Sequence, residues 1–193
     1  MLTLATGNAH KVKELQAMLG IPVRGLGSFP DFPPVVEDGD SFEANAIKKA
    51  VALARHAGDW ALADDSGLAV DALGGAPGIH SARYAGKHGD DAANNAKLLR
   101  ELAPHADRSA RFVCVLALSD ARGTCLTYRG ECQGRIAREA TGAHGFGYDP
   151  LFVPEGYGQS FAELGPDIKG KISHRARALA KLLESWGGRL AGL

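Results

Sequence analysis

The sequence predicts an α/β protein with a mixed sheet, and three observations support this class. Strand-like and helix-like segments alternate over residues 1–102. A turn signal at residues 120–123 then joins two long strand-like segments, which is typical of a hairpin. The chain has 193 residues, of which 45% are apolar and 23% charged, without internal repeats, and this indicates one globular domain over residues 1–193.

Charge and composition exclude several classes of protein. Lys+Arg and Asp+Glu both number 22, so a protein that coats nucleic acid or an anionic membrane is not expected. The N-terminus does not resemble a signal peptide, and no apolar run is long enough to cross a membrane. The three cysteines lack C-x-x-C spacing and the seven histidines lack paired spacing, so no structural metal is expected. We therefore expect a soluble, cytoplasmic protein with no nucleic-acid or membrane partner.

The first predicted unit is a strand at 1–5, a turn at 6–8 and a helix at 9–19, which Gly20 ends. Lys11 lies in the first turn of this helix, where a cation opposes the helix dipole and gains nothing structurally. It makes sense if an anion binds the free N–H groups of that turn. The alternative is a solvated lysine on a surface helix, and the phosphate interpretation is preferred.

Residues 21–26 read as a short strand, 28–39 as a proline-containing loop and 40–56 as a long helix. Asp40 with Glu43 three residues later resembles a capping box. Glu43 is therefore either a capping residue or an acidic metal ligand, and both roles stay open.

Two adjacent acids, Asp64 and Asp65, separate predicted strands at 60–63 and 68–73. Buried carboxylates repel each other unless a cation lies between them, and Mg²⁺ usually takes one or two protein carboxylates. The alternative is a solvated turn, because Asp, Ser and Gly are ordinary turn residues. Adjacent side chains in an extended segment point opposite ways, so the two acids are not expected to bind one metal equally.

The second half begins with a glycine-rich loop at 74–78, followed by a predicted helix at 90–102. Strands are expected at 110–119 and 124–137. Arg83 could bind a phosphate or pair with a surface acid, and the sequence does not decide between these roles.

Aromatic residues alternate with glycines at 141–150, without the order of a dinucleotide-binding fingerprint. Such aromatics can stack on a base or fill the core. A helix is predicted from Ser173 to about residue 186. The densest basic cluster precedes and begins this helix, and it favours an anion there over a solvated basic face. Its members are Lys169, Lys171, His174, Arg175 and Arg177.

Six motifs in this order resemble the inosine triphosphate pyrophosphatase family, from Leu4 to about Leu179. They are Ala5-Thr6-Gly7-Asn8-x-x-Lys11, Ala63-Asp64-Asp65-Ser66-Gly67-Leu68, Gly74-Gly75-Ala76-Pro77-Gly78, Ser81-Ala82-Arg83-Tyr84, Gly145-Phe146-Gly147-Tyr148-Asp149-Pro150 and Ser173-His174-Arg175. The resemblance implies an elongated mixed β-sheet flanked by helices, with two lobes, a central cleft and a homodimer. It also implies Mg²⁺-dependent hydrolysis of ITP, dITP and XTP to the monophosphate and pyrophosphate.

The resemblance assigns roles by motif position. Asp65 would be the general base and a magnesium ligand. The substrate-binding residues would be Thr6, Gly7, Asn8, Lys11, Ser66, Phe146, Gly147, Tyr148, Asp149, Lys169, His174 and Arg175. The family often has a metal-binding Glu where this chain has Ala44, and Glu43 lies about 100° away on the helix, so the second ligand (Glu43 or Asp64) stays open.

The expected mechanism is in-line attack of water on the α-phosphorus, with Asp65 as the base. His174 and Arg175 can donate hydrogen bonds to a 6-oxo group, which an adenine lacks, and such a site rejects the wrong base strongly. Three alternatives stay open. They are a serine hydrolase using Ser66, a nucleotide-binding module without catalysis, and a pyrophosphatase for other modified nucleotides.

Overall fold

The computed structural model describes residues 1–190 of the chain. The prediction of one domain over residues 1–193 therefore includes three residues, 191–193, that lie outside the described range.

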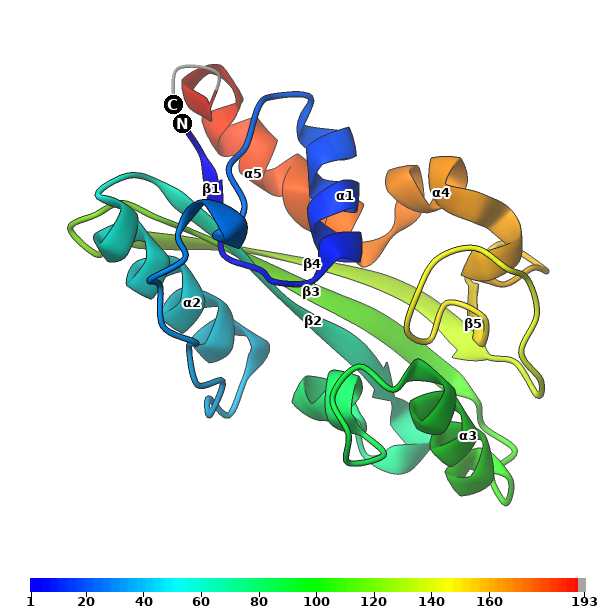
Figure 1. Cartoon of the computed structure of the whole chain (residues 1–193). Coiled ribbons are helices and arrows are strands. Elements are labelled where there is room, and N and C mark those ends of the chain that lie inside the picture. Colours follow the sequence, from blue (N-terminus) through cyan, green and yellow to red (C-terminus); the bar gives the residue numbers. More distant parts are fainter. Residues whose placement is uncertain (191–193) are drawn as a thin grey trace. The chain divides into compact units, whose positions relative to one another are not determined.

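The fold combines one mixed five-stranded sheet with flanking helices (Figure 1), which confirms the predicted α/β class. The strand order is β1-β2-β3-β4-β5, with β1 and β2 parallel and β4 and β5 antiparallel. The strands are β1 (Thr3–Leu4), β2 (Ala61–Val70), β3 (Ser109–Ser119), β4 (Cys125–Ile136) and β5 (Phe152–Pro154). The α-helices are α1 (Ala9–Leu19), α2 (Phe42–Ala57), α3 (Asp91–Leu102), α4 (Phe161–Ile172) and α5 (His174–Leu190). Short 3-10 helices are η1 (Leu26–Ser28), η2 (Asp71–Leu73) and η3 (Gly78–Arg83).

The chain divides into two compact units, each built from several stretches of sequence. The first unit contains Met1–Asp65, Cys114–Gly130 and the chain from Arg175 onward. The second contains Ser66–Val113 and Glu131–His174.

The core of the first unit lies between its strands and two of its helices. Figure 1 shows α1 and α5 on one face of these strands and α2 on the other. Leucines of α1 and α5 pack on the strands in one apolar cluster, which contains Leu15, Leu19, Leu62, Leu116, Leu179 and Leu182 among others. Burying a leucine side chain contributes about 2 kcal/mol, so this cluster fixes α1 and α5 against the sheet.

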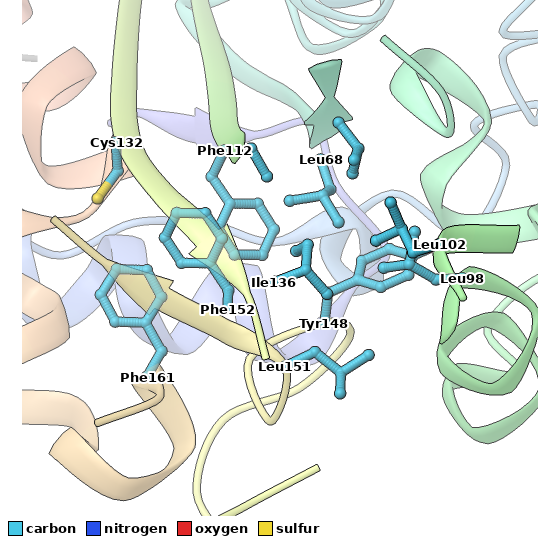
Figure 2. Close-up of a cluster of buried hydrophobic side chains, with 12 residues drawn as sticks. Leu68, Leu98, Leu102, Phe112, Cys132, Ile136, Tyr148, Leu151, Phe152 and Phe161 are labelled. Atoms are coloured by element: carbon cyan, nitrogen blue, oxygen red, sulfur yellow. The ribbon is translucent and has the colours of Figure 1, made fainter. Parts of the chain in front are cut away.

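The core of the second unit is rich in aromatic rings. Phe112, Phe152 and Phe161 pack together, and the ring centroids of Phe112 and Phe152 lie 4.6 Å apart. Figure 2 shows Phe161 of α4 at one end of this cluster and Leu98 and Leu102 of α3 at the other. Helices α3 and α4 are therefore both anchored to one core.

The termini of α1 and α3 were predicted within one residue, because their capping residues are local signals. Asn8 caps α1, and Gly20 ends it in the left-handed conformation at φ 63°. Asp90 caps α3 by accepting a hydrogen bond from the Ala93 N–H. Helix α2 begins later than predicted, because Ser41 and not Asp40 is its cap, so the predicted Asp40–Glu43 capping box is wrong.

Three other predictions of secondary structure were wrong or incomplete. No strand forms at residues 21–26, where Arg24 makes a single bridge to Thr3. The two strands expected around Asp64 and Asp65 are one continuous strand, β2, which is buried on both faces over nearly its whole length. Strand β5 and helix α4 were missed. Helix α4 was missed because it is interrupted by Gly165 (φ 79°, ψ 176°) followed by Pro166.

Among the residues described, no helix is both long and apolar enough to cross a membrane.

Candidate active site

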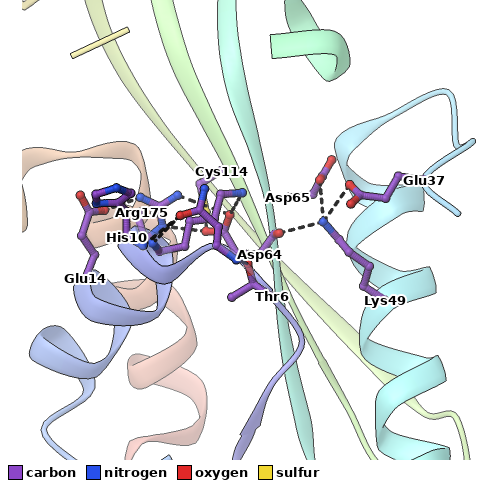
Figure 3. A network of polar contacts seen from close by, with 11 residues as sticks. Thr6, His10, Glu14, Glu37, Lys49, Asp64, Asp65, Cys114 and Arg175 are labelled. Carbon is purple, nitrogen blue, oxygen red and sulfur yellow. Dashed lines mark hydrogen bonds and ion pairs between the residues drawn. The ribbon is translucent and has the colours of Figure 1, made fainter. Parts of the chain in front are cut away.

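Two adjacent carboxylates occupy the middle of β2, in the first unit, and point to opposite faces of the strand (Figure 3). Asp64 faces α1 and α5, where Lys11 Nζ lies 2.6 Å from Oδ1 and Arg175 Nε lies 2.7 Å from Oδ2. The Cys114 thiol also donates to Asp64 Oδ2, at 3.2 Å. Asp65 faces α2 and accepts a hydrogen bond from Lys49 Nζ at 2.7 Å. The alternation of an extended strand thus gives the two acids separate environments.

Asp64 is a fully paired, ionised acid. Its side chain is closed to solvent, and burial alone would raise its pKa, but the charges of Arg175 and Lys11 outweigh burial and hold the pKa well below its usual range. Arg175 is itself buried and also pairs with Glu14. Removing either partner would leave an uncompensated charge in the core, so this cluster rigidly joins β2, α1 and α5.

Asp65 is in a different electrostatic state. Burial, together with the neighbouring Glu37 carboxyl, raises its pKa to about 6 against the opposing charge of Lys49. Lys49 Nζ also lies 3.0 Å from Glu37 Oε2 and donates to the Asp64 carbonyl oxygen. Burial opposes the charge on Lys49, but Asp65 and Glu37 together raise the pKa of its ammonium, which therefore stays protonated.

Asp65 and Glu37 are the residues that could hold a magnesium ion. Their carboxyl groups both pair with the Lys49 ammonium, at 3.0 Å for Glu37 and 2.7 Å for Asp65, so both lie around the same small volume. Carboxylate oxygens are hard donors that suit Mg²⁺, which needs only one or two of them beside water and phosphate oxygens. The part of the chain that is described contains no group of three or more His, Cys, Asp or Glu side chains able to hold a metal.

Sequence reasoning missed Glu37, and neither residue it considered as second ligand lies in this pair. Glu37 is in an irregular loop between prolines and α2, where no periodicity marks it. Glu43 instead pairs with Arg129 at 2.8 Å, with both side chains substantially exposed. Asp64 is occupied by Lys11 and Arg175 on the other face of the strand.

The turn before α1 carries the residues predicted to hold phosphates. Asn8 Oδ1 accepts hydrogen bonds from the His10 and Lys11 N–H groups, so part of the helix N-terminus already has a partner. Thr6 Oγ1 accepts from the Asn8 N–H, and Gly7 is exposed. The argument that Lys11 gains nothing structurally was wrong, because its ammonium neutralises Asp64. Lys11 is still 15% exposed at its side chain, so an anion can approach it.

A second cluster of the predicted residues lies in the second unit. Lys169 Nζ is 2.6 Å from Asp149 Oδ2 and stands 4.5 Å from the centroid of the Phe146 ring. Asp149 Oδ2 also accepts a hydrogen bond from the Phe146 N–H, which closes a tight turn. Lys169 and Asp149 are almost fully buried, whereas Phe146 is only partly buried. A flat aromatic face beside fixed charges is suited to a planar, polar ligand.

Gly145 is required by this turn, because a Cβ atom there would lie 2.1 Å from Asp149 Oδ2. Tyr148 does not present its ring to a ligand: it is 4% exposed, packs in the aromatic core and donates its hydroxyl to the Ser81 carbonyl oxygen at 2.7 Å. Only the backbone of Tyr148 is therefore available to contact a ligand.

The remaining predicted residues are divided between the units. His174 is buried, and its ring stacks on Phe112 with centroids 4.7 Å apart. Ser66 directly follows Asp65 in β2 and is partly buried. The first unit thus brings together Asp65 and Lys49, and separately Lys11 and Arg175 around Asp64, while the second brings together Phe146, Asp149 and Lys169.

Comparisons with known proteins identify the family of this chain. The model of the Ham1 family matches residues 2–185. A protein named dITP/XTP pyrophosphatase from Desulforamulus reducens is 54% identical over 188 residues, which cover 95% of this chain and 94% of that protein. A protein of the same name from Rhodopirellula baltica is 54% identical over 184 residues, covering 92% and 88% of the two chains.

Solved structures give the same assignment. A HAM1 protein from Coxiella burnetii superposes with a TM-score of 0.89 at 41% identity, over 97% of this chain and 98% of that one. The Ham1 protein of Staphylococcus aureus superposes with a TM-score of 0.87 at 40% identity, with the same coverage. The family to which the sequence motifs pointed is confirmed, and the chain belongs to the Ham1 family.

Proposed function

We propose that this protein hydrolyses non-standard purine nucleoside triphosphates (dITP, XTP and ITP) to the monophosphate and pyrophosphate. The enzyme class, nucleoside triphosphate pyrophosphatase, follows from the many relatives of that name that match nearly the whole chain. The observation that carries the mechanism is Asp65, a buried carboxyl whose pKa is raised to about 6 and which shares the Lys49 ammonium with Glu37.

Asp65 acts as the general base in this proposal. A raised pKa makes a carboxylate a better proton acceptor than a solvated aspartate, while most of it remains ionised at neutral pH. The positive charge of Lys49 stabilises the ionised form of the buried Asp65 carboxylate, and its hydrogen bond holds that carboxylate in one orientation. Asp65 therefore can orient a water molecule and take its proton as the oxygen attacks the α-phosphorus.

Asp65 and Glu37 would hold Mg²⁺. When bound, the ion would neutralise charge on the phosphate oxygens. Lys11, which is partly exposed beside the Thr6–Asn8 turn, supplies a cation for the same phosphates. Asp64 keeps the Lys11 ammonium directed toward β2 and so limits where a phosphate can bind it.

Recognition of the base is proposed for the second unit. The Phe146 ring offers a stacking face, and Lys169 and Asp149 offer charges at fixed positions beside it. His174 is held in one orientation by its stacking on Phe112, so its ring nitrogens can discriminate between a 6-oxo and a 6-amino group. Arg175 keeps its predicted role in the site, but its guanidinium also neutralises Asp64 and Glu14.

A panel of nucleoside triphosphates assayed for pyrophosphate, with and without Mg²⁺, tests the proposal. We expect release from ITP, dITP and XTP that far exceeds release from ATP and GTP and that stops in EDTA. Ester hydrolysis without Mg²⁺ would instead indicate a serine hydrolase that uses Ser66, and ITP binding without turnover would indicate a nucleotide-binding module. The homodimer and the cytoplasmic location stay predictions, which sedimentation and cell fractionation would test.

A further inference from the structure

Helix α3 holds the backbone of the Phe146–Asp149 turn through two side chains that no sequence motif singled out. We infer that Asp91 and Asn95 are positioning residues for base recognition, which act by fixing the peptide groups on both sides of Gly147. This inference rests on the proposed function, because it takes the Phe146 ring as the stacking face for the base.

The contacts form a clamp on one residue. The Gly147 N–H donates to Asp91 Oδ2 at 2.7 Å, and Asn95 Nδ2 donates to the Gly147 carbonyl oxygen at 2.9 Å. Asp91 and Asn95 are four residues apart in α3, so both side chains lie on the same face of the helix. The hydrogen-bonding groups of Gly147 are therefore engaged by α3.

The Asn95 amide makes this contact in an orientation that leaves its other polar atom unfavourably buried. Its Oδ1 atom is buried and has no hydrogen-bond partner among the residues described. A buried amide oxygen without a partner is unfavourable, and turning the amide over would place that oxygen against the Gly147 carbonyl. The orientation that satisfies Gly147 is thus kept although it leaves Oδ1 unpaired.

The free side of Gly147 faces open space. Its φ angle is 61°, and a Cβ atom built there would have no atom within 4 Å. With its polar groups turned to α3, the glycine leaves room where a flat ligand can approach the backbone closely. The open side thus belongs to the same turn as the partly buried Phe146 ring.

The clamp connects a rigid helix to the proposed stacking face. Helix α3 is anchored by Leu98 and Leu102 in the aromatic core, and its N-terminus is capped by Asp90. Phe146 precedes Gly147 and is bonded through its N–H to Asp149. A change in the Gly147 peptide therefore rotates the Phe146 backbone and shifts its ring relative to Lys169.

The test compares four variants with wild type: Asp91→Ala, Asp91→Asn, Asn95→Leu and the control Asp90→Asn. The control removes one negative charge from the same helix end but keeps a capping oxygen, because Asn caps as well as Asp. Steady-state kinetics with ITP and ATP, the Kd of inorganic tripolyphosphate, and hydrogen exchange of peptides covering residues 143–150 are measured for each.

We expect Asp91→Ala and Asn95→Leu to raise KM for ITP and lower kcat/KM at least about tenfold, with a smaller ITP-to-ATP ratio, because a misplaced stacking face costs binding and orientation. Tripolyphosphate binding should stay within about twofold of wild type, because the proposed phosphate residues are in the first unit. Asp91→Asn should restore most of the activity, since its amide oxygen can still accept from the Gly147 N–H.

The inference would be overturned if Asp91→Ala and Asn95→Leu changed kcat/KM for ITP no more than the control Asp90→Asn does. A parallel loss of ITP and tripolyphosphate binding would also overturn it. If wild type releases no pyrophosphate from ITP, the proposed function fails on its own. The clamp is then tested by hydrogen exchange at residues 143–150 and by the Kd of ITP. Asp91→Ala must speed exchange and weaken ITP binding more than the control Asp90→Asn does.

Discussion

Arg175 and Asp64 form an ion pair in the core of the first unit, with Nε 2.7 Å from Oδ2 and both side chains closed to solvent. A buried pair of this kind adds little net stability, but breaking it is costly because one charge is left without its partner. The pair therefore fixes the position of α5 relative to β2 and keeps Asp64 ionised beside Asp65, the proposed general base.

We predict that Arg175→Met lowers the free energy of unfolding by about 3 kcal/mol, because Asp64 then keeps only Lys11 as a counter-charge. Urea denaturation measures this change. Arg177→Met, which removes the same charge from an exposed position on α5, should cost less than about 0.5 kcal/mol. Equal costs for the two variants would contradict a structural role for the pair.

Asp65→Asn should abolish nearly all pyrophosphate release while leaving the protein folded, because the amide cannot accept the proton of the attacking water. The matched control is Asp71→Asn, the same substitution at an exposed position just beyond the end of β2. Activity of Asp65→Asn above a tenth of wild type would remove Asp65 from the role of general base.

Glu37→Gln should raise the Mg²⁺ concentration needed for half-maximal activity on the order of tenfold, since one of two proposed carboxylate ligands loses its charge. Magnesium titrations of the rate measure this. Asp38→Asn, which changes an exposed neighbour paired with Lys48, should leave the titration unchanged, and so should Glu43→Gln, whose partner is Arg129. A shift with Glu43→Gln but not with Glu37→Gln would identify Glu43 as the ligand.

Lys11→Ala should raise KM for a nucleoside triphosphate more than the Kd of the nucleoside inosine, because the side chain is proposed to bind phosphate. It should also lower stability, since Asp64 loses one of its two cations. Lys13→Ala, on the same helix but exposed, serves as the control. Equal effects on the triphosphate and on inosine would place Lys11 outside the phosphate site.

Glu163 gives a prediction for the pH dependence of stability. The Ser160 N–H and the Thr141 hydroxyl both donate to its carboxylate, and they lower its pKa below the ordinary value of 4.5. A lowered carboxyl pKa stabilises the fold above pH 4.5, and this contribution is lost as the pH falls through the folded-state value. Glu163→Gln should therefore unfold at a lower urea concentration than wild type at pH 7, and the difference should shrink below pH 4.5. A difference that stays constant with pH would mean that the charge of Glu163 contributes nothing.

The sequence by itself determined the α/β class, the boundaries of α1 and α3, and the family. These features depend on signals close together in the chain. Asn8 and Gly20 mark the ends of α1 through capping, and the order of short motifs identifies the family. The opposite directions of Asp64 and Asp65 were also predicted, because alternation is a property of any extended strand.

Only the tertiary structure decided which partners these acids have. Glu37 and Lys49 lie 28 and 16 residues before Asp65, and Arg175 lies 111 residues after Asp64. No local pattern encodes such contacts, since they arise when α2 and α5 pack on β2. The same reason explains the errors: Lys11 looked unfavourable on its helix until Asp64 was placed beside it, and β2 looked like two strands until burial on both faces was seen. Local signals fix elements, whereas the charge state of a site depends on groups that only folding brings together.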